Sequence, residues 1–349
     1  MGDVSPQLPA VTRDQAPDSA GAVKVTGAPA SAGLSGSSAV ARAGTVATDA
    51  IDLSALDALV GLLRGRRVVV LAGAGCSTES GIPDYRGPDG SLRTRKPIQY
   101  QDFVRSESAR ARYWARSAIG WPRMATARPN ECHRALAALE ERGAVRGLIT
   151  QNVDGLHHAA GSRRVVELHG SLATVCCLTC GRTESRDEYQ ERLRSANPAW
   201  WPRWMTDGGL LVAPGAESGP DDEVSGVASA PDGDAELAAS ATESFRVVPC
   251  AACGGILKPD VVFFGENVPP ARLTEAWRVF DEGEVLLVVG SSLTVYSGRR
   301  FVHRAQERGL PVAIVNLGPT RADEVAAAKV EGRVGELLPR LAAALIAAT

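Results

Sequence analysis

The chain has 349 residues, of which 44% are hydrophobic and 22% are charged, and its formal net charge is -2. This balance is typical of a globular protein and gives no electrostatic basis for general binding to DNA or RNA. No apolar run reaches the roughly 18 residues of a membrane span, so we also expect no membrane insertion. The length suits roughly two ordinary domains, and a chain of this size does not depend on disulfides for stability.

The first part of the chain, residues 1–50, is rich in Ala, Gly, Ser, Pro and Thr and has no apolar periodicity. This composition predicts a disordered N-terminal tail. Met1–Pro9 has neither the basic nor the apolar region of a secretory signal, and Asp3, Asp14 and Asp18 argue against a transit peptide. We therefore expect a cytoplasmic protein.

Short apolar runs alternate with helical patterns along the rest of the chain. The apolar runs are at 67–72, 145–150, 285–290 and 312–316, and the helical patterns are clearest at 53–64, 133–141, 299–308 and 335–347. The alternation predicts an α/β fold with a Rossmann-like parallel sheet and helices on both faces. Ligands bind such a sheet beyond the carboxyl ends of its strands, so polar residues that follow the strands are candidates for a site.

Two C-x-x-C pairs, Cys177 with Cys180 and Cys250 with Cys253, are each followed by Gly, in the manner of a zinc knuckle. Each pair presents two thiolates at a spacing suited to one edge of a tetrahedron, so together they predict one structural zinc ion. Neither pair opens a helix after a strand, as a thioredoxin-like dithiol does. A redox role therefore fits these cysteines less well than zinc.

The segment between the two pairs includes Asp207–Ser244, which contains nine acidic residues and no Lys or Arg. We expect a disordered acidic insertion here, acting as a solvated spacer or as an interaction segment. The predicted organisation is a Rossmann-like large domain from residues 51–170 and 258–349, and a four-cysteine zinc module from residues 171–257.

A glycine-rich turn follows the first predicted strand and reads Gly73-Ala74-Gly75-Cys76-Ser77. It resembles a dinucleotide-binding loop, in which missing side chains and free backbone N–H groups let a pyrophosphate approach. It departs from G-x-G-x-x-G because Thr78 stands at the last Gly position, and no strand ending in an acidic residue follows about 20 residues later. An ordinary hydride-transfer enzyme is therefore disfavoured.

Gln151, Asn152 and Asp154 follow the second predicted strand, and His169 stands shortly before the first cysteine pair. At strand ends, such amide, carboxylate and imidazole groups can converge on a ribose. The order Gly-Ala-Gly, Gln-Asn-Val-Asp, His-Gly and paired cysteines resembles the sirtuins, the NAD-dependent protein deacylases. Residues 258–266, 290–297 and 316–318 extend this similarity to about residues 53–345.

Four further motifs are similar to the class II branch of the sirtuins, which includes the mitochondrial human sirtuin with weak deacetylase activity. These motifs lie at 113–116, 120–122, 160–164 and 318–321. Cys76 stands where Ile is usual. A succinyl preference is not expected, because Ser91 stands where the desuccinylase branch carries Tyr, although Arg93 can match its Arg.

The resemblance implies that NAD binds at the strand ends, between the large domain and the zinc module. The implied NAD contacts are Gly73, Ala74, Gly75, Ser77, Asp84, Tyr85, Arg86, Gln151, Asn152, Asp154, Gly290, Ser291, Ser292, Asn316, Leu317, Gly318 and Val334. It further implies that His169 is the general base and that Asn152 and Asp154 act at the nicotinamide end. Val262, Phe263, Gly265 and Glu266 would lie along the acyl-lysine substrate. Zinc would stabilise the small module without taking part in the reaction.

The implied reaction joins the acyl-lysine oxygen to the nicotinamide ribose and yields nicotinamide, deacylated lysine and O-acyl-ADP-ribose. The expected partners are acyl-lysine proteins, with no nucleic acid, no membrane and a monomeric chain. One alternative, mono-ADP-ribosyl transfer, needs nearly the same residues. A second, a catalytically weak NAD-binding regulatory role, is less favoured, because an idle domain has no need to keep His169, Asn152 and Asp154 together. A zinc-ribbon protein that binds nucleic acid is a poorer alternative, because the net charge is -2.

Overall fold

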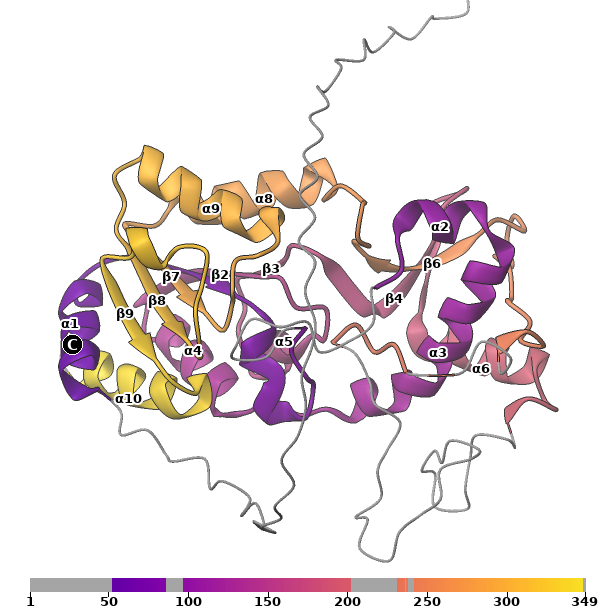
Figure 1. The fold of residues 1–349 in the computed structure, drawn as a ribbon, viewed down its shortest axis with the longest axis horizontal. Helices are drawn as coiled ribbons and strands as arrows, with labels where there is room; N and C mark the ends of the chain where they lie inside the picture. Colours follow the sequence, from indigo (N-terminus) through magenta and orange to yellow (C-terminus); the bar gives the residue numbers. More distant parts are fainter. Residues whose placement is uncertain (1–51, 86–96, 202–230, 236, 238–241, 348–349) are drawn as a thin grey trace, which may run out of the picture. The chain divides into compact units, whose positions relative to one another are not determined.

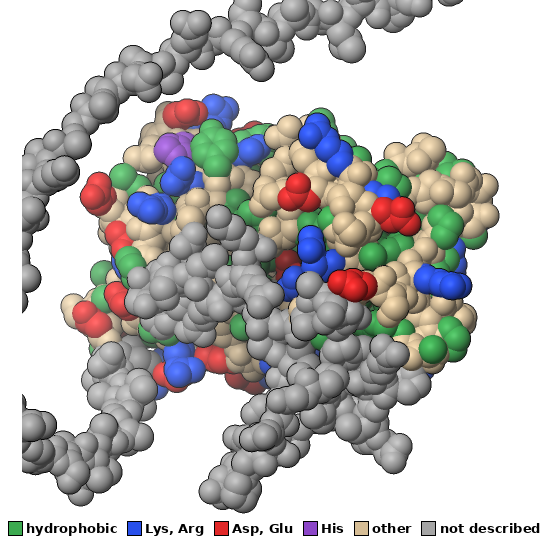
Figure 2. Space-filling view, turned by 45° about the vertical axis from the view of Figure 1, so that its right-hand side comes forward, with side chains coloured by type: hydrophobic (Ala, Val, Ile, Leu, Met, Phe, Trp, Pro, Cys, Tyr) green, Lys and Arg blue, Asp and Glu red, His purple; other side chains and the backbone are tan. Residues whose placement is uncertain are grey.

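The computed structural model describes residues 52–85, 97–201, 231–235, 237 and 242–347 (Figure 1). The predicted tail over 1–50 and the acidic residues 207–230 lie outside this part of the chain. Within the described ranges, no helix combines the length and the apolar character needed to cross a bilayer. On the face drawn in Figure 2, Lys and Arg side chains are interspersed with Asp and Glu.

The larger sheet has six strands in the order β3-β2-β1-β7-β8-β9, and every neighbouring pair is parallel (Figure 1). The strands are β1 Val68–Ala72, β2 Val145–Thr150, β3 Val165–Glu167, β7 Val285–Val289, β8 Val312–Asn316 and β9 Ala328–Glu331. The four predicted apolar runs form its four central strands. The edge strands β3 and β9 contain only three and four residues, too few for a period to be visible in the sequence.

Helices cover both faces of this sheet, which confirms the predicted α/β architecture (Figure 1). One face is covered by α1 Leu53–Leu63, α4 Glu131–Glu141 and α10 Val334–Ile346, and the other by α8 Pro270–Asp281 and α9 Tyr296–Glu307. Successive side chains of β1 alternate between the two cores: Val68, Val70 and Ala72 enter one, and Val69 and Leu71 enter the other. Because both faces are buried, the strand is a continuous apolar run.

The second sheet has three antiparallel strands in the order β5-β4-β6. Its strands are β4 Gly170–Cys177, β5 Thr183–Ser185 and β6 Leu257–Val261, and the helices beside it are α2 Tyr100–Arg105, α3 Glu107–Thr126 and α6 Arg186–Ala196. In the core of this part, the rings of Trp114 and Tyr189 meet with centroids 4.6 Å apart. The buried guanidinium of Arg186 donates to the side chains of Gln190 and Ser117, so the buried charge has polar partners.

This sheet changes the expected division of the chain. β6 pairs with β4, although its residues 258–261 were expected in the large domain. Residues 231–235 lie inside the predicted disordered insertion, yet they pack against α3. The guanidinium of Arg116 lies 2.8 Å from Asp234 Oδ1 and donates to the carbonyl of Ala235 at 2.7 Å. These residues are therefore ordered, because Ala235 and Leu237 bury their side chains in the core of the smaller part.

Candidate active site

The glycine-rich turn after β1 packs directly against the loop after β7. The amide of Gly73 donates to the Val289 carbonyl at 2.9 Å, and that of Gly75 donates to the Gly290 carbonyl at 2.8 Å. A Cβ on Gly73 would lie 2.6 Å from the Cβ of Ser291, and a Cβ on Gly75 would lie 2.9 Å from the Cα of Gly290. Close packing of the two loops therefore requires glycine here, a reason different from the close ligand approach suggested by the sequence.

The turn leads into the short 3-10 helix η1, Ala74–Ser80, whose Ser77 meets the loop after β2. Ser77 Oγ donates to Asp154 Oδ2 at 2.6 Å and accepts a hydrogen bond from Asn152 Nδ2 at 3.0 Å. Burial raises the pKa of Asp154, while hydrogen bonds from Ser77 and the Leu156 amide act in the opposite direction. Three of the predicted site residues thus form one hydrogen-bonded group.

His169 lies just before β4 and is held at both ring nitrogens. Its Nδ1 lies 2.9 Å from the carbonyl oxygen of Gln151, and its Nε2 lies 2.7 Å from Ser297 Oγ. A carbonyl oxygen only accepts hydrogen bonds, so Nδ1 carries the proton and Nε2 is the basic nitrogen. Burial lowers the pKa of His169, and the hydrogen bond to Gln151 opposes this effect. The imidazole is therefore neutral at pH 7, as a general base must be.

Ser297 was not among the predicted site residues. It is the second residue of α9 and stands at the end of segment 290–297, where the sirtuin similarity was noted. Nothing in the sequence pairs it with His169, from which it is 128 positions away. The contact arises because α9 begins beside the carboxyl edge of the larger sheet.

Gln151 links two of the predicted loops. Its side-chain amide donates to Ser291 Oγ at 2.8 Å, and its backbone amide donates to the Ala72 carbonyl at 2.9 Å. After β8, the Asn316 side chain donates to the carbonyls of Leu317 at 3.0 Å and Gly318 at 3.1 Å. The loops after β1, β2 and β7 are thus joined to one another, while Asn316 stabilises its own loop.

The remaining predicted NAD contacts are placed around these loops. Val334 begins α10, and the absent side chain of the next residue, Gly335, leaves room for the Glu79 carboxylate of η1. Ser292 Oγ lies 3.1 Å from Thr294 Oγ1. Asp84 and Tyr85 follow η1, and Arg86 lies outside the described residues.

Tyr85 brings the cofactor loop close to both the substrate segment and the acidic insertion. Its ring makes an edge contact with Phe264, with centroids 6.0 Å apart. Burial, together with the nearby Asp232 carboxylate, raises the pKa of the Tyr85 hydroxyl. Asp232 belongs to the segment that the composition placed outside the fold. The ordered end of the insertion therefore lies beside the predicted cofactor loop.

The predicted substrate segment continues from β6 and is tied to the general base. The Val262 amide donates to the His169 carbonyl at 2.8 Å. Phe263, predicted to lie along the substrate, is only 7% exposed, and its ring packs against Tyr113. It is therefore part of the core of the smaller part. Its neighbour Phe264, which was not predicted, is 39% exposed.

A turn after Val262 and Phe263 is held by the last predicted substrate residue. Glu266 Oε2 accepts from the Phe263 amide at 2.9 Å and from Lys258 Nζ at 3.2 Å. Gly265 has a φ of +77°, a conformation that favours glycine. The carboxylate of Glu266 therefore stabilises this turn, and its Oε2 bonds groups of the protein itself.

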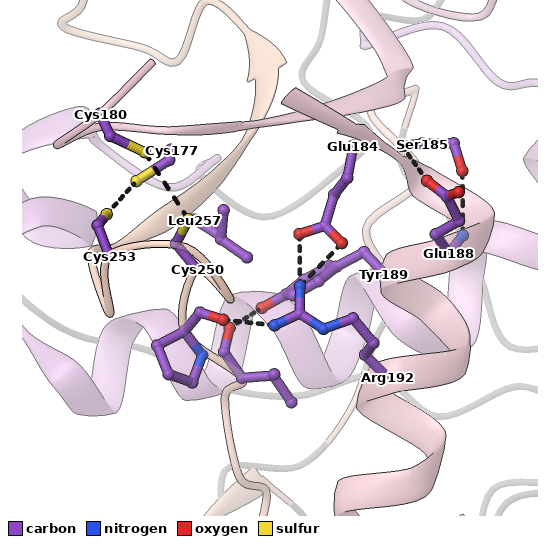
Figure 3. A network of polar contacts seen from close by, with 12 residues as sticks. Cys177, Cys180, Glu184, Ser185, Glu188, Tyr189, Arg192, Cys250, Cys253 and Leu257 are labelled. Carbon is purple, nitrogen blue, oxygen red and sulfur yellow. Dashed lines mark hydrogen bonds and ion pairs between the residues drawn. The ribbon is translucent and has the colours of Figure 1, made fainter. Parts of the chain in front are cut away.

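The four predicted zinc ligands come together at one end of the smaller sheet (Figure 3). All four Sγ atoms lie within 4.8 Å of one another; Cys177 and Cys253 are 3.5 Å apart, and Cys180 and Cys250 are 3.8 Å apart. A tetrahedral site with Zn–S bonds of about 2.3 Å requires sulfur separations of about 3.8 Å, so the residues fit zinc. Hydrogen bonds from the amides of Cys180 and Thr179 lower the pKa of the Cys177 thiol to about 6, which favours the thiolate.

Polar contacts from α6 hold the segment that leads into the cysteine cluster, as Figure 3 also shows. The Arg192 guanidinium bonds Glu184 of β5 at 2.6 Å and the Pro249 carbonyl at 2.5 Å. The Tyr189 hydroxyl donates to the Val248 carbonyl at 2.8 Å. The chain that leads into Cys250 is thereby tied to α6.

Residues 73–297 match the model of the Sir2 family. The chain belongs to the Sir2 family. It is 50% identical over 284 residues to NAD-dependent protein deacetylase 1 of Mycobacterium avium, covering 81% of this chain and 93% of the relative. It is 51% identical over 280 residues to NAD-dependent protein deacetylase 1 of Streptomyces coelicolor, covering 80% and 86%.

Solved Sir2 structures share the fold. A Sir2 complex with a p53 peptide and NAD+ has a TM-score of 0.59 at 30% identity, and covers 83% of this chain and 95% of that one. A Sir2 structure with an acetylated peptide has a TM-score of 0.59 at 27% identity, with 82% and 96% covered. In this Sir2 chain, the family match begins at Gly73 and ends at Ser297, the residue that bonds His169.

Proposed function

We propose that this chain is an NAD-dependent protein-lysine deacylase that releases nicotinamide, deacylated lysine and O-acyl-ADP-ribose. The observation that carries the proposal is the neutral His169, whose basic Nε2 lies at the carboxyl edge of the larger sheet. The loop of Asn152 and the loop of Ser77 meet at the same edge. The deacetylases of about 50% identity support the assignment.

NAD supplies an activated ribose carbon, which the acyl-lysine oxygen attacks as nicotinamide leaves. The chain's own loops provide positioning, since Ser77, Asn152 and Asp154 are already connected before ligands bind. Such preorganisation raises the rate because the reacting groups lose less freedom when the complex forms. His169 would then take a proton from a ribose hydroxyl as that oxygen adds to the imidate carbon. The proton would leave with the lysine amine, and water would complete O-acyl-ADP-ribose.

Two segments that contact His169 also expose apolar side chains. Val262 and Ser297 bond its carbonyl and its Nε2. Their neighbours Phe264 and Val295 are 39% and 43% exposed. An extended acyl-lysine peptide fits these features, since its backbone can pair with the segment after β6 while apolar side chains shield the acyl group.

The test incubates full-length, zinc-loaded protein with NAD and peptides bearing acetyl, propionyl, longer aliphatic or acidic acyl-lysines. Mass spectrometry scores O-acyl-ADP-ribose and freed lysine together. Both products are expected from at least one peptide, and His169→Ala and Asn152→Ala should lower both to a small fraction of the wild-type yield. His303→Ala changes an exposed histidine on the outer side of α9 and should have no effect. Mass added to protein without freed lysine would favour mono-ADP-ribosyl transfer instead.

The class II resemblance, the cytoplasmic location and the monomeric state stay predictions. The acyl panel bears on the first. A preference for acidic acyl groups would favour the desuccinylase branch instead, although Ser91 stands where that branch carries Tyr. Cell fractionation tests the location. Light scattering on the purified full-length chain tests the monomer.

A further inference from the structure

The basic nitrogen of His169 is already occupied. Because Nδ1 donates to the Gln151 carbonyl at 2.9 Å, Nε2 has no hydrogen, and the Ser297 hydroxyl donates to it at 2.7 Å. Nε2 has one lone pair. A ribose hydroxyl therefore has no direct access to this nitrogen while the bond from Ser297 persists.

The imidazole cannot easily offer its other nitrogen. Turning the ring would leave the Gln151 carbonyl without this donor, which is unfavourable for a buried polar group. Gln151 itself is anchored, because its backbone amide donates to Ala72 and its side chain to Ser291. The backbone of His169 is held as well, through its carbonyl and the Val262 amide. The arrangement around Nε2 is thus built into the fold.

Ser297 is suited to stand between His169 and a ligand. It is half-buried at the start of α9, so this residue is not sealed inside the core. A serine hydroxyl accepts hydrogen bonds as well as donating one. No other hydrogen bond of this hydroxyl occurs among the residues that the structure describes. An incoming hydroxyl can therefore donate to Ser297 Oγ.

We propose that Ser297 carries the proton from the ribose hydroxyl to His169. The proposal rests on the proposed deacylase function. As the ribose oxygen bonds to the imidate carbon, its proton passes to Ser297 Oγ, and the proton of Ser297 passes to His169 Nε2. One ribose O–H bond breaks, one C–O bond forms, the serine hydroxyl is restored and the imidazole becomes an imidazolium. The balance requires no further reactant.

The charge around His169 suits a brief protonation. Burial lowers its pKa, and the guanidinium groups of Arg300 and Arg272 act in the same direction. The imidazole is thus neutral before the reaction, and the imidazolium gives up its proton readily once the lysine amine departs. A relay to such a base needs only a short-lived proton transfer.

The test separates the two chemical steps in a single turnover. Full-length Ser297→Ala, Ser297→Thr and wild-type protein are mixed with excess NAD and an acetyl-lysine peptide, and nicotinamide and deacetylated peptide are quantified at each time. Ser297→Ala should release nicotinamide within about twofold of the wild-type rate, but form deacetylated peptide at least about tenfold more slowly. Ser297→Thr keeps the hydroxyl and should retain most of the second step. Adding His169→Ala to Ser297→Ala should slow that step no further than His169→Ala alone, because residues acting as one unit are not additive.

Two outcomes overturn the relay. The first is a Ser297→Ala variant that forms deacetylated peptide at the wild-type rate, or one in which both steps slow equally. The second comes from wild-type protein in mixtures of H₂O and D₂O: the second step should depend quadratically on the deuterium fraction, since two protons move together, and a linear dependence contradicts the relay. A wild-type protein that releases no nicotinamide from NAD and acyl-peptide would instead refute the proposed function.

Discussion

Ser77 donates a 2.6 Å hydrogen bond to Asp154, and this bond joins the loop after β1 to the loop after β2. The same hydroxyl accepts from the side chain of Asn152 at 3.0 Å. Because both loops lie at the carboxyl edge of a parallel sheet, one serine orders the region in which the cofactor is proposed to bind. The site therefore depends on Ser77 even if that residue takes no part in the chemistry.

We expect Ser77→Ala to raise the KM for NAD roughly tenfold or more, because a hydrogen bond to a charged group contributes about 1.5–3 kcal/mol. The KM for the acyl-peptide should change little. Steady-state kinetics at varied NAD and calorimetric titration of NAD provide the measurement. Ser108→Ala, which removes an exposed hydroxyl on α3, is the matched control. An unchanged affinity for NAD in Ser77→Ala would contradict the role assigned to the bond.

Loss of one zinc ligand should unfold the smaller part of the molecule. Cys250→Ser is expected to reduce bound zinc from about one per chain to near zero and to lower Tm and solubility, because metal binding and folding are coupled. Cys176→Ser is the control, since this residue adjoins the cluster without belonging to it. Elemental analysis and thermal scans measure both properties. Full zinc content and an unchanged Tm in Cys250→Ser would show that the cluster is not the metal site.

The described end of the insertion should matter for stability. Asp234→Ala removes the partner of Arg116 at a site where the two side chains are 9% and 16% exposed. We expect a loss of roughly 1–3 kcal/mol in the free energy of unfolding, because a poorly solvated guanidinium loses its carboxylate partner and keeps only the Ala235 carbonyl. Glu131→Ala breaks the exposed pair with Arg134 and should cost less than about 1 kcal/mol. Urea unfolding compares the two variants, and equal losses would argue against the packing of residues 231–235.

Two buried histidines should make the protein sensitive to acid. The rings of His133 and His157 lie 4.7 Å apart, and burial lowers the pKa of both, that of His133 to about 4. As pH falls, the unfolded chain binds protons first, since its histidines titrate near 6.5. The free energy of unfolding is therefore unaffected by these histidines above pH 6.5. It falls between pH 6.5 and about 4, by roughly 3 kcal/mol for His133 alone.

Urea unfolding at several pH values from 7.5 to 4.5 measures this dependence. His133→Asn should flatten the curve, whereas His303→Asn, at an exposed position, should leave it unchanged. If His133→Asn loses stability toward acid as steeply as the wild type, the buried histidine is not the cause.

Local patterns in the sequence were sufficient for the central sheet and the metal site. The apolar runs of β1, β2, β7 and β8 were visible because strands buried on both faces need apolar residues at every position. The zinc ligands were visible because each C-x-x-C pair brings two thiolates together within a single turn. The order of the motifs was sufficient to indicate the family.

Tertiary structure decided the contacts between distant segments. Ser297 reaches His169 across 128 positions because β7 and β2 flank β1 in the sheet. Asp234 reaches Arg116 because a few apolar residues of an otherwise acidic segment bury themselves against α3. Composition and spacing indicate the secondary structure and local motifs of each segment, but not which other segment it contacts. Which loops meet at one edge of the sheet depends on strand order and packing, and these exist only in the folded chain.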